Sequence, residues 1–393
     1  MDMVKLRAWW ARKQGLDGSL AQAGPAEVLA RTGWARSVGG VNPYLQLFSR
    51  AGVARETADQ AVADLAVHEL PSARGCTYVL PASDFAVGLR VGENAPLAEV
   101  AVCERLGVPR REIDEVAGAV LAALDEAGGP LDPRRLKAEL GDVVRNLGEA
   151  GKKKGVTTTL PVALGLLQST GEIRRVPLTG RLDQQRFSYV RWSLPAARPT
   201  AEEARAELAR RYWTWTGGAT LKQFRWFSAF TARDAKAAVE PLGLVPLDGD
   251  LLMLPEDRKA YEDFTPPPGP AYSLVGWIDG LTLLRRDLRS VLDPADAARV
   301  LPSALAGKPL GDLADLPAQG IVDRGRVIGL WEYDPSEGTI VWGTFGAAGD
   351  ALRDAVEATE AFVRGQLGDA RGGSLDNPGK RRPRLEAVRS IGR

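Results

Sequence analysis

Basic residues gather in two stretches of this sequence, although the chain as a whole is almost neutral. It has 51 lysines and arginines against 50 acidic residues. Between Lys152 and Trp192 eight bases accompany two acids, and from Arg371 to Arg393 seven bases accompany two acids. A local excess of positive charge attracts polyanions, so these stretches are where we expect one to bind. The bases of the first stretch are Lys152, Lys153, Lys154, Arg174, Arg175, Arg181, Arg186 and Arg191.

Other residue types exclude several kinds of chemistry. Cys76 and Cys103 are the two cysteines and His68 is the one histidine, so the sequence predicts neither a disulfide framework nor a zinc-type metal site. Asp279 and Asp287 are eight residues apart, which on a helix separates them by about 12 Å. We interpret both as helix-capping and salt-bridging groups. No phosphate-binding or dinucleotide-binding glycine motif occurs, and we expect no metal and no cofactor.

Composition and length indicate a globular protein with several domains. Hydrophobic residues make up 45% of the 393 residues and charged residues 26%, which excludes wholesale disorder. At about 100 to 200 residues per domain, two to four units are expected. The charged N-terminus lacks the apolar core of a secretion signal, and no run of about 18 apolar residues occurs. We therefore expect a cytoplasmic protein without a membrane partner.

Predicted elements in the middle of the chain follow the order of a winged helix-turn-helix. A helix with regularly spaced apolar residues stops at Gly128, and Asp132 is placed to cap the next one. Thr157 to Thr159 can cap a third helix, after which two strands form a basic hairpin. In this architecture the third helix and the hairpin read DNA. The predicted helices are 114–127, 132–140 and 160–170, and the strands are 172–177 and 186–192.

Related patterns occur on both sides of this unit. Trp215 is expected in a turn of the third unit, and Asp248-Gly249 is typical of a hairpin turn. The tail after Arg371 is rich in glycine, proline and arginine and is expected to be mobile. The predicted helices are 4–14, 25–37, 43–50, 57–69, 200–211, 221–230, 232–240 and 350–367. The strands are 76–80, the hairpin 242–254 and a group within 320–345.

We therefore predict a mainly α fold with small β wings, of the α+β class. Three tandem winged helix-turn-helix units would form a C-shape around a cleft of duplex size. A β-rich segment and a basic, flexible tail would follow. The predicted parts are an N-terminal winged-helix-like unit with a candidate active-site segment, a winged helix with the basic hairpin, a third winged helix, a β-rich subdomain with a C-terminal helix, and the tail. Their bounds are 1–113, 114–198, 199–257, 258–370 and 371–393.

Several short sequence motifs, which we call phrases, occur along the chain. None of them is specific alone, but their order indicates a resemblance to a family. They are KQGLD at 13–17, VGGV at 38–41, RG at 74–75, YVL at 78–80, DF at 84–85, GGATL at 217–221 and VDRGRVIG at 322–329. Over most of the chain this order resembles the winged-helix DNA glycosylases typified by AlkZ and YcaQ, which excise alkylated or crosslinked purines. The resemblance implies DNA binding and repair.

The resemblance also points to candidate catalytic residues. The family carries a Gln-x-Gln or Gln-x-Asp motif after its first strand, which places the hydrolytic water, and the corresponding residues here look like Asn42 and Tyr44. Asn42 keeps an amide, whereas a phenol with a pKa of about 10 is no ready base at neutral pH. The family's histidine after Arg-Gly is replaced by Tyr78, which can still stack on a base. Gln46 would face away from Asn42 on a helix. Equally, Asn42-Pro43 fits a helix cap without catalytic function.

Two functions remain open for this bacterial-type sequence. The first is a monofunctional DNA glycosylase that repairs alkylated or crosslinked bases, with Asn42 and Tyr44 as catalytic residues and Asp279 near the family's loop aspartate. The alternative is a non-catalytic winged-helix protein that recognises damaged, bent or junction DNA, or an architectural or regulatory factor. In both cases the protein would be a nucleoid-associated monomer, with Lys152 to Lys154 and Arg181 facing one groove. The expected contacts to double-stranded DNA are Lys152, Lys153, Lys154, Thr157, Arg174, Arg175, Arg181, Arg186 and Tyr78.

Overall fold

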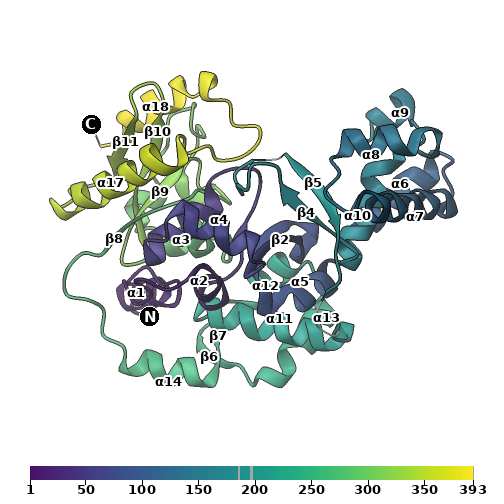
Figure 1. Cartoon of the computed structure of the whole chain (residues 1–393). Coiled ribbons are helices and arrows are strands. Elements are labelled where there is room, and N and C mark those ends of the chain that lie inside the picture. The colour runs from purple at the N-terminus through teal and green to yellow at the C-terminus, as the bar shows by residue number, and fades with distance from the viewer. Residues whose placement is uncertain (185, 195–197, 393) are drawn as a thin grey trace.

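The computed structural model describes residues 1–184, 186–194 and 198–392. The chain is mainly helical and carries small antiparallel sheets, as Figure 1 shows, so the predicted fold class is confirmed. The segment from α6 to β5 lies to one side of the molecule, and the C-terminal sheet lies at the other with α17 and α18 (Figure 1). Within the described residues, no helix has the length and apolar character needed to cross a membrane.

The segment from α6 to β5 has the predicted helices and hairpin. The apolar stripe of α7 is buried against α10, and Gly128 ends α7 with a φ of 59°. Asp132 caps α8 by accepting hydrogen bonds from the amides of Arg134 and Arg135, whereas Thr158 takes the cap position of α10 without a side-chain hydrogen bond. The elements are α6 Leu97–Arg105, α7 Arg110–Ala127, α8 Pro133–Leu140, α9 Gly148–Lys152, α10 Thr159–Thr170, β4 Ile173–Pro177 and β5 Phe187–Arg191.

The segment from α11 to β7 differs from the prediction at one tryptophan. The first helix continues to Thr216, so Trp215 lies in its last turn rather than in a loop, is fully buried, and donates a hydrogen bond to the Ala30 carbonyl at 2.9 Å. Thr220 and Thr231 cap the following helices through their side chains. The elements are α11 Ala201–Thr216, α12 Leu221–Ser228, α13 Ala232–Val239, β6 Val245–Asp248 and β7 Leu251–Met253.

The N-terminal segment contains a three-stranded sheet with the strand order β1-β3-β2. The predicted helix 57–69 is wrong in its second half, because Leu65 adopts a positive φ of 56° and the chain then pairs with β3 as a strand. Apolar residues of α1 share a core with the C-terminal sheet. The elements are α1 Met3–Lys13, α2 Pro25–Thr32, β1 Ala35–Arg36, α3 Asn42–Ala51, α4 Arg55–Ala63, β2 Val67–Pro71, β3 Thr77–Pro81 and α5 Phe85–Gly92.

A four-stranded antiparallel sheet with the order β11-β10-β9-β8 forms the centre of the C-terminal segment. Strand β10 is buried along almost its whole length, because α17 and α18 and the N-terminal helices cover the sheet. The elements are α14 Pro255–Asp263, β8 Tyr272–Val275, α15 Gly280–Leu283, α16 Pro294–Ala297, β9 Gln319–Asp323, β10 Arg326–Asp334, β11 Thr339–Thr344, α17 Ala351–Phe362 and α18 Arg382–Arg389.

The basic tail is folded where the sequence predicts mobility. Helix α18 packs on β10 and β11, and the Arg381 side chain is buried between Asp369 and Asp376 at 2.5 and 3.1 Å. The prediction is wrong because the arginines of the tail find carboxylate partners, among them Glu332 for Arg384 and Asp334 for Arg389 on β10, which no local pattern reveals. Arg393, the last base of the tail, lies outside the described residues.

Candidate nucleic-acid interface

Tyr44 fixes the tip of the β4–β5 hairpin to the N-terminal segment. Its side chain is buried, its hydroxyl donates to the Asp59 carboxylate, and the Leu182 amide donates to the same hydroxyl at 2.8 Å. Burial raises the pKa of the Tyr44 phenol well above its ordinary value, and the hydrogen bond with Asp59 adds to the increase. A neutral phenol with these contacts has a structural function at the hairpin tip.

Arg181 belongs to the same contact. Its guanidinium pairs with Asp183 and donates to the Leu367 carbonyl at 3.0 Å. Arg371 in turn donates to the Asp183 carbonyl at 2.9 Å. Because protein groups already balance the Arg181 charge, a DNA phosphate would have to displace them before this arginine could bind it.

Asn42 points away from Tyr44. Residues two apart on a helix lie about 200° apart around its axis, so the two side chains leave α3 on opposite sides. The Asn42 Nδ2 donates to the Arg36 carbonyl at 3.0 Å, while its Oδ1 faces Gly276 without a hydrogen-bond partner among the described residues. The structure therefore does not bring the predicted catalytic pair together. Neither does Asn42 cap α3, because Val41 takes that position.

A buried polar network contains Gln14, from the KQGLD phrase at 13–17, and Asp279. Arg50 donates two hydrogen bonds to Asp279, both at 2.8 Å, and a third to Gln14 at 3.1 Å. Gln14 donates to the carbonyls of Thr32 and Trp215, each at 2.8 Å. Asp279 also caps α15 through the Leu281 amide. The predicted capping and salt-bridging function of Asp279 is confirmed, and its complete burial makes it part of the core rather than of an open site.

Asp287 and Gln46, which the sequence analysis also considered, do not contribute to a shared site with Asn42 or Asp279. Helix α15 ends at Leu283, so Asp287 is not on one helix with Asp279 as the spacing argument assumes, and its side chain is exposed. Gln46 is buried and donates to the Gly33 carbonyl at 3.0 Å. Gln46 is therefore explained by the local fold, whereas the interpretation of Asp287 as a capping and salt-bridging group is wrong, because its side chain makes neither contact among the described residues.

Tyr78 is a core residue. Its ring is 2% exposed and lies against Trp34 and Phe227 on one face of the N-terminal sheet. The Arg36 guanidinium lies 5.3 Å from the ring centroid. The prediction that Tyr78 stacks on a base is wrong for this structure, because no open face of the ring remains.

The three lysines of the middle segment are exposed but lie apart from the hairpin tip. Lys152 ends the short helix α9 and Lys153 and Lys154 follow it, at the outer end of the α6–β5 segment (Figure 1). The hairpin tip with Arg181 instead contacts α3 and α4. The expected convergence of these bases on one groove is therefore not found. Arg186 is exposed on the hairpin.

A groove brings two of the predicted DNA-binding residues together. It has a volume of about 550 Å³ and lies between the N-terminal sheet and the α6–β5 segment. Thr157 and Arg175 line it together with Lys137, while Glu99 is the acid among its lining residues. Arg174 lies beside Arg175 on β4, and burial lowers the pKa of its guanidinium. The base of the hairpin, rather than its tip, therefore presents positive charge to a groove.

A carboxylate missed by the sequence analysis lies at the edge of this groove. Glu69 on β2 accepts a hydrogen bond from the Ser37 hydroxyl, and its Oε2 lies 3.9 Å from the Arg175 guanidinium. The side chains of Glu69 and Arg175 are 14% and 27% exposed. A carboxylate in such a place can orient a water and take its proton, and the adjacent cation can bind a phosphate. Residues 67–71 (VHELP) do not alternate between apolar and polar side chains, and the sequence analysis placed Glu69 at the end of the predicted helix 57–69.

A second basic feature adjoins the groove near Gly75. The guanidiniums of Arg74 and Arg286 lie 4.5 and 4.4 Å from the ring centroid of Trp226. Both arginines have positive φ angles, 57° and 48°, which is uncommon for residues other than glycine and costs free energy. Exposed arginines around an aromatic ring are a typical surface for nucleic acid. We call these three residues the Trp226 cluster.

The described residues include no group of three histidine, cysteine, aspartate or glutamate side chains placed to hold a metal ion.

Comparisons with known proteins point to a single family. The chain matches the family described as DNA glycosylase AlkZ-like over residues 22–364. Among solved structures, the DNA glycosylase AlkZ of Streptomyces sahachiroi is similar, with a TM-score of 0.69 and 21% sequence identity over 94% of this chain and 98% of that chain. No curated protein matches the chain. At this identity the structural likeness shows the fold alone.

Proposed function

The chain belongs to the AlkZ-like DNA glycosylase family, and from this premise we propose that it binds double-stranded DNA along the groove and the Trp226 cluster and hydrolyses the N-glycosidic bond of a modified base. The proposed substrates are alkylated or crosslinked bases, and the proposed role is DNA repair. Phosphate contacts would supply most of the affinity, which would therefore fall steeply with salt.

The observation that carries this proposal is the pairing of Glu69 with Arg175 at the edge of the groove. Strand pairing in the N-terminal sheet positions Glu69, and the β4–β5 hairpin positions Arg175. One side chain can thus bind a phosphate of the DNA backbone while its neighbour acts on a nucleotide close by. No comparable half-buried pair exists at Asn42 or Tyr44, since both are buried.

We propose that Glu69 takes the proton of the attacking water. The water oxygen would form a bond to the anomeric carbon of the deoxyribose, and the bond from that carbon to the base nitrogen would break with its electron pair leaving on the base. Ser37, which donates to Glu69, would keep the carboxylate oriented. The nucleotide must first leave the base stack or be trapped in a bent duplex.

The test is excision from a duplex that contains a 7-methylguanine, read as alkali-labile abasic sites. We expect Glu69→Gln to lower the rate by about 100-fold or more with little change in duplex affinity, as for loss of a general base. Glu99→Gln, which changes the acid that lines the same groove, is the matched control. Loss of excision in Asn42→Ala with full activity in Glu69→Gln would instead support the Asn42 site.

A second function is favoured by the burial of Asn42 and Tyr44. The sequence analysis places these two residues at the positions of the family's catalytic motif, and buried side chains there cannot reach a nucleotide. The protein would then recognise damaged, bent or junction DNA without cleaving a bond. Tight binding of the wild-type protein to the lesion duplex without base release, across several alkyl adducts, would support this function and contradict the assignment of Glu69.

A further inference from the structure

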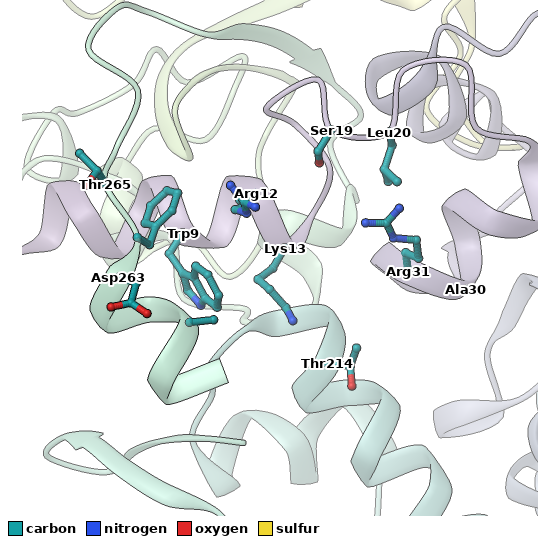
Figure 2. A pocket seen from close by; sticks show the side chains of 12 residues that line it. Trp9, Arg12, Lys13, Ser19, Leu20, Ala30, Arg31, Thr214, Asp263 and Thr265 are labelled. Atoms are coloured by element: carbon teal, nitrogen blue, oxygen red, sulfur yellow. The ribbon is translucent and has the colours of Figure 1, made fainter. Parts of the chain in front are cut away.

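A cavity on another part of the molecule is unused by the proposed function. It has a volume of about 700 Å³ and lies between α1, α2, α11 and α14, away from the residues that line the groove. Figure 2 shows Arg12 and Lys13 reaching it from α1 and Arg31 from α2, on opposite sides of the opening. The volume is within the range of about 300 to 1,000 Å³ that is usual for small-molecule sites.

The charges around this cavity are mainly positive and partly unbalanced. Arg12 is exposed and has no ion pair among the residues that the structure describes. Arg31 pairs with Glu27 at 3.2 Å, but both side chains are more than half exposed, so that pair is weak and easily exchanged. Lys13 is held more firmly by Asp257 at 2.8 Å. The two arginines are therefore the groups available to an anion.

Aromatic and small apolar side chains complete the cavity. The Arg12 guanidinium lies 5.8 Å from the centroid of the Phe264 ring, and Trp9 is fixed by a hydrogen bond from its Nε1 to the Gly217 carbonyl at 2.8 Å. Leu20 and Ala30 line the cavity next to Arg31. Asp263, the acid among the lining residues, lies on the far side of Trp9 from Arg31 (Figure 2). The positive groups and the aromatic edge thus face the same space.

Helix dipoles do not account for this arrangement by themselves. Arg12, Lys13 and Arg31 lie in the last turns of α1 and α2, where cations favour the helix C-termini. That effect favours a basic side chain at the C-terminus of each helix separately. It does not determine the direction in which the side chain points, because water can solvate its charge on any side. It gives no reason for bases of two helices to face one cavity with an aromatic wall.

We propose that this cavity binds the phosphate group of a nucleotide, held between Arg12 and Arg31, with the nucleoside against the half-buried Phe264. Guanidinium groups form forked, charge-assisted hydrogen bonds to phosphate, and aromatic edges accommodate a base or sugar. The phosphate can belong to a free nucleotide or to the backbone of DNA outside the groove. The inference does not depend on catalysis at Glu69.

The experiment compares the wild-type chain with the double variant Arg12→Ala/Arg31→Ala. Binding of adenosine 5′-monophosphate is measured by titration calorimetry, and binding of an undamaged duplex is measured by fluorescence anisotropy over a range of salt concentrations. Arg110→Ala is the matched control, because Arg110 is also an exposed arginine in an i,i+4 pair, with Asp114 at 2.8 Å. Thermal unfolding confirms that all variants are folded, which is expected because the substituted side chains are exposed.

We expect at least a tenfold loss of one of the two affinities in the double variant and no loss in the control. Loss of nucleotide binding alone identifies a free nucleotide as the ligand. Loss of duplex affinity, with a salt slope smaller by about 0.9 for each phosphate contact removed, identifies the DNA backbone. Unchanged binding in both arms overturns the inference, as does an equal loss in Arg110→Ala. Since neither arm measures excision, these outcomes are independent of the Glu69 test.

Discussion

The two ends of the β4–β5 hairpin differ in what their arginines do. At the tip, Arg181 forms an ion pair with Asp183 and donates a hydrogen bond to the Leu367 carbonyl. The hydrogen bond of Tyr44 with Asp59 belongs to the same contact. At the base, Arg175 lies on the wall of a groove, 3.9 Å from Glu69. The same residue type, on one hairpin, is thus used for docking at one end and lines a groove at the other, where it also lies over the Phe187 ring.

This difference shows that a count of basic residues does not locate an interface. Both arginines belong to the basic stretch between residues 152 and 192, yet only Arg175 lines the groove. A charge whose partners are already in place gains little from a phosphate, because those contacts must first be broken. The following predictions test this contrast, beginning with the largest effect.

Tyr44→Ala should lower the free energy of unfolding by about 3 to 5 kcal/mol, because a large buried side chain leaves a cavity under the hairpin tip. Chemical denaturation measures the loss. Tyr44→Phe keeps the ring and should cost about 1 to 3 kcal/mol for the lost hydroxyl contacts, with excision unchanged. A Tyr44→Phe protein of normal stability that no longer excises a base would contradict the structural assignment of Tyr44.

Acid should lower the free energy of unfolding of the protein through His68, which is buried close to Arg174 and Arg175. Burial lowers the pKa of His68 to about 3 from its ordinary 6.5, and the adjacent Arg174 and Arg175 add to the shift. As the pH falls below 6.5, the His68 imidazole becomes protonated in the unfolded chain but stays neutral in the folded protein. The free energy of unfolding therefore decreases. Between pH 6.5 and pH 5 this amounts to about 2 kcal/mol. Urea unfolding should show the loss in the wild-type protein and not in His68→Phe; parallel pH profiles would rule the mechanism out.

Arg175→Ala should weaken duplex binding about tenfold and reduce the salt slope by about 0.9, as for one phosphate contact. Arg181→Ala is the matched comparison on the same hairpin. It should change the affinity by less than about threefold and instead lower stability by about 1 kcal/mol, through loss of a half-buried pair. Salt-dependent anisotropy titrations decide between them. The reverse result, with Arg181 controlling the slope, would place the interface at the tip.

Local signals determined most of the secondary structure. Gly128 ends α7, Asp132 caps α8, and Thr231 caps α13 as their types and positions predict. The spacing of apolar residues predicted the helices. The Asp248-Gly249 turn predicted the β6–β7 hairpin. These signals act over a few residues, and so they can be detected without knowing what packs on top. The division of the chain into five parts remains a prediction.

Long-range contacts decided the candidate site. Asn42 and Tyr44 are two residues apart in sequence and diverge in space, because a helix turns about 100° per residue. Ser37, Glu69 and Arg175 are distant in sequence and meet, because β2 pairs in the N-terminal sheet and the hairpin packs beside it. The same kind of contact placed Tyr78 in the core and gave Arg381 its carboxylate partners.

The sequence by itself determined the family, the fold class and the ends of several helices, such as the C-terminus of α7 and the N-terminus of α8, since these follow from residue types, their order and their spacing. Only the tertiary structure decided which charges remain open to a ligand. The free energy of a charged side chain depends on burial and on the partners within a few ångströms, and those partners come from segments far away in the chain.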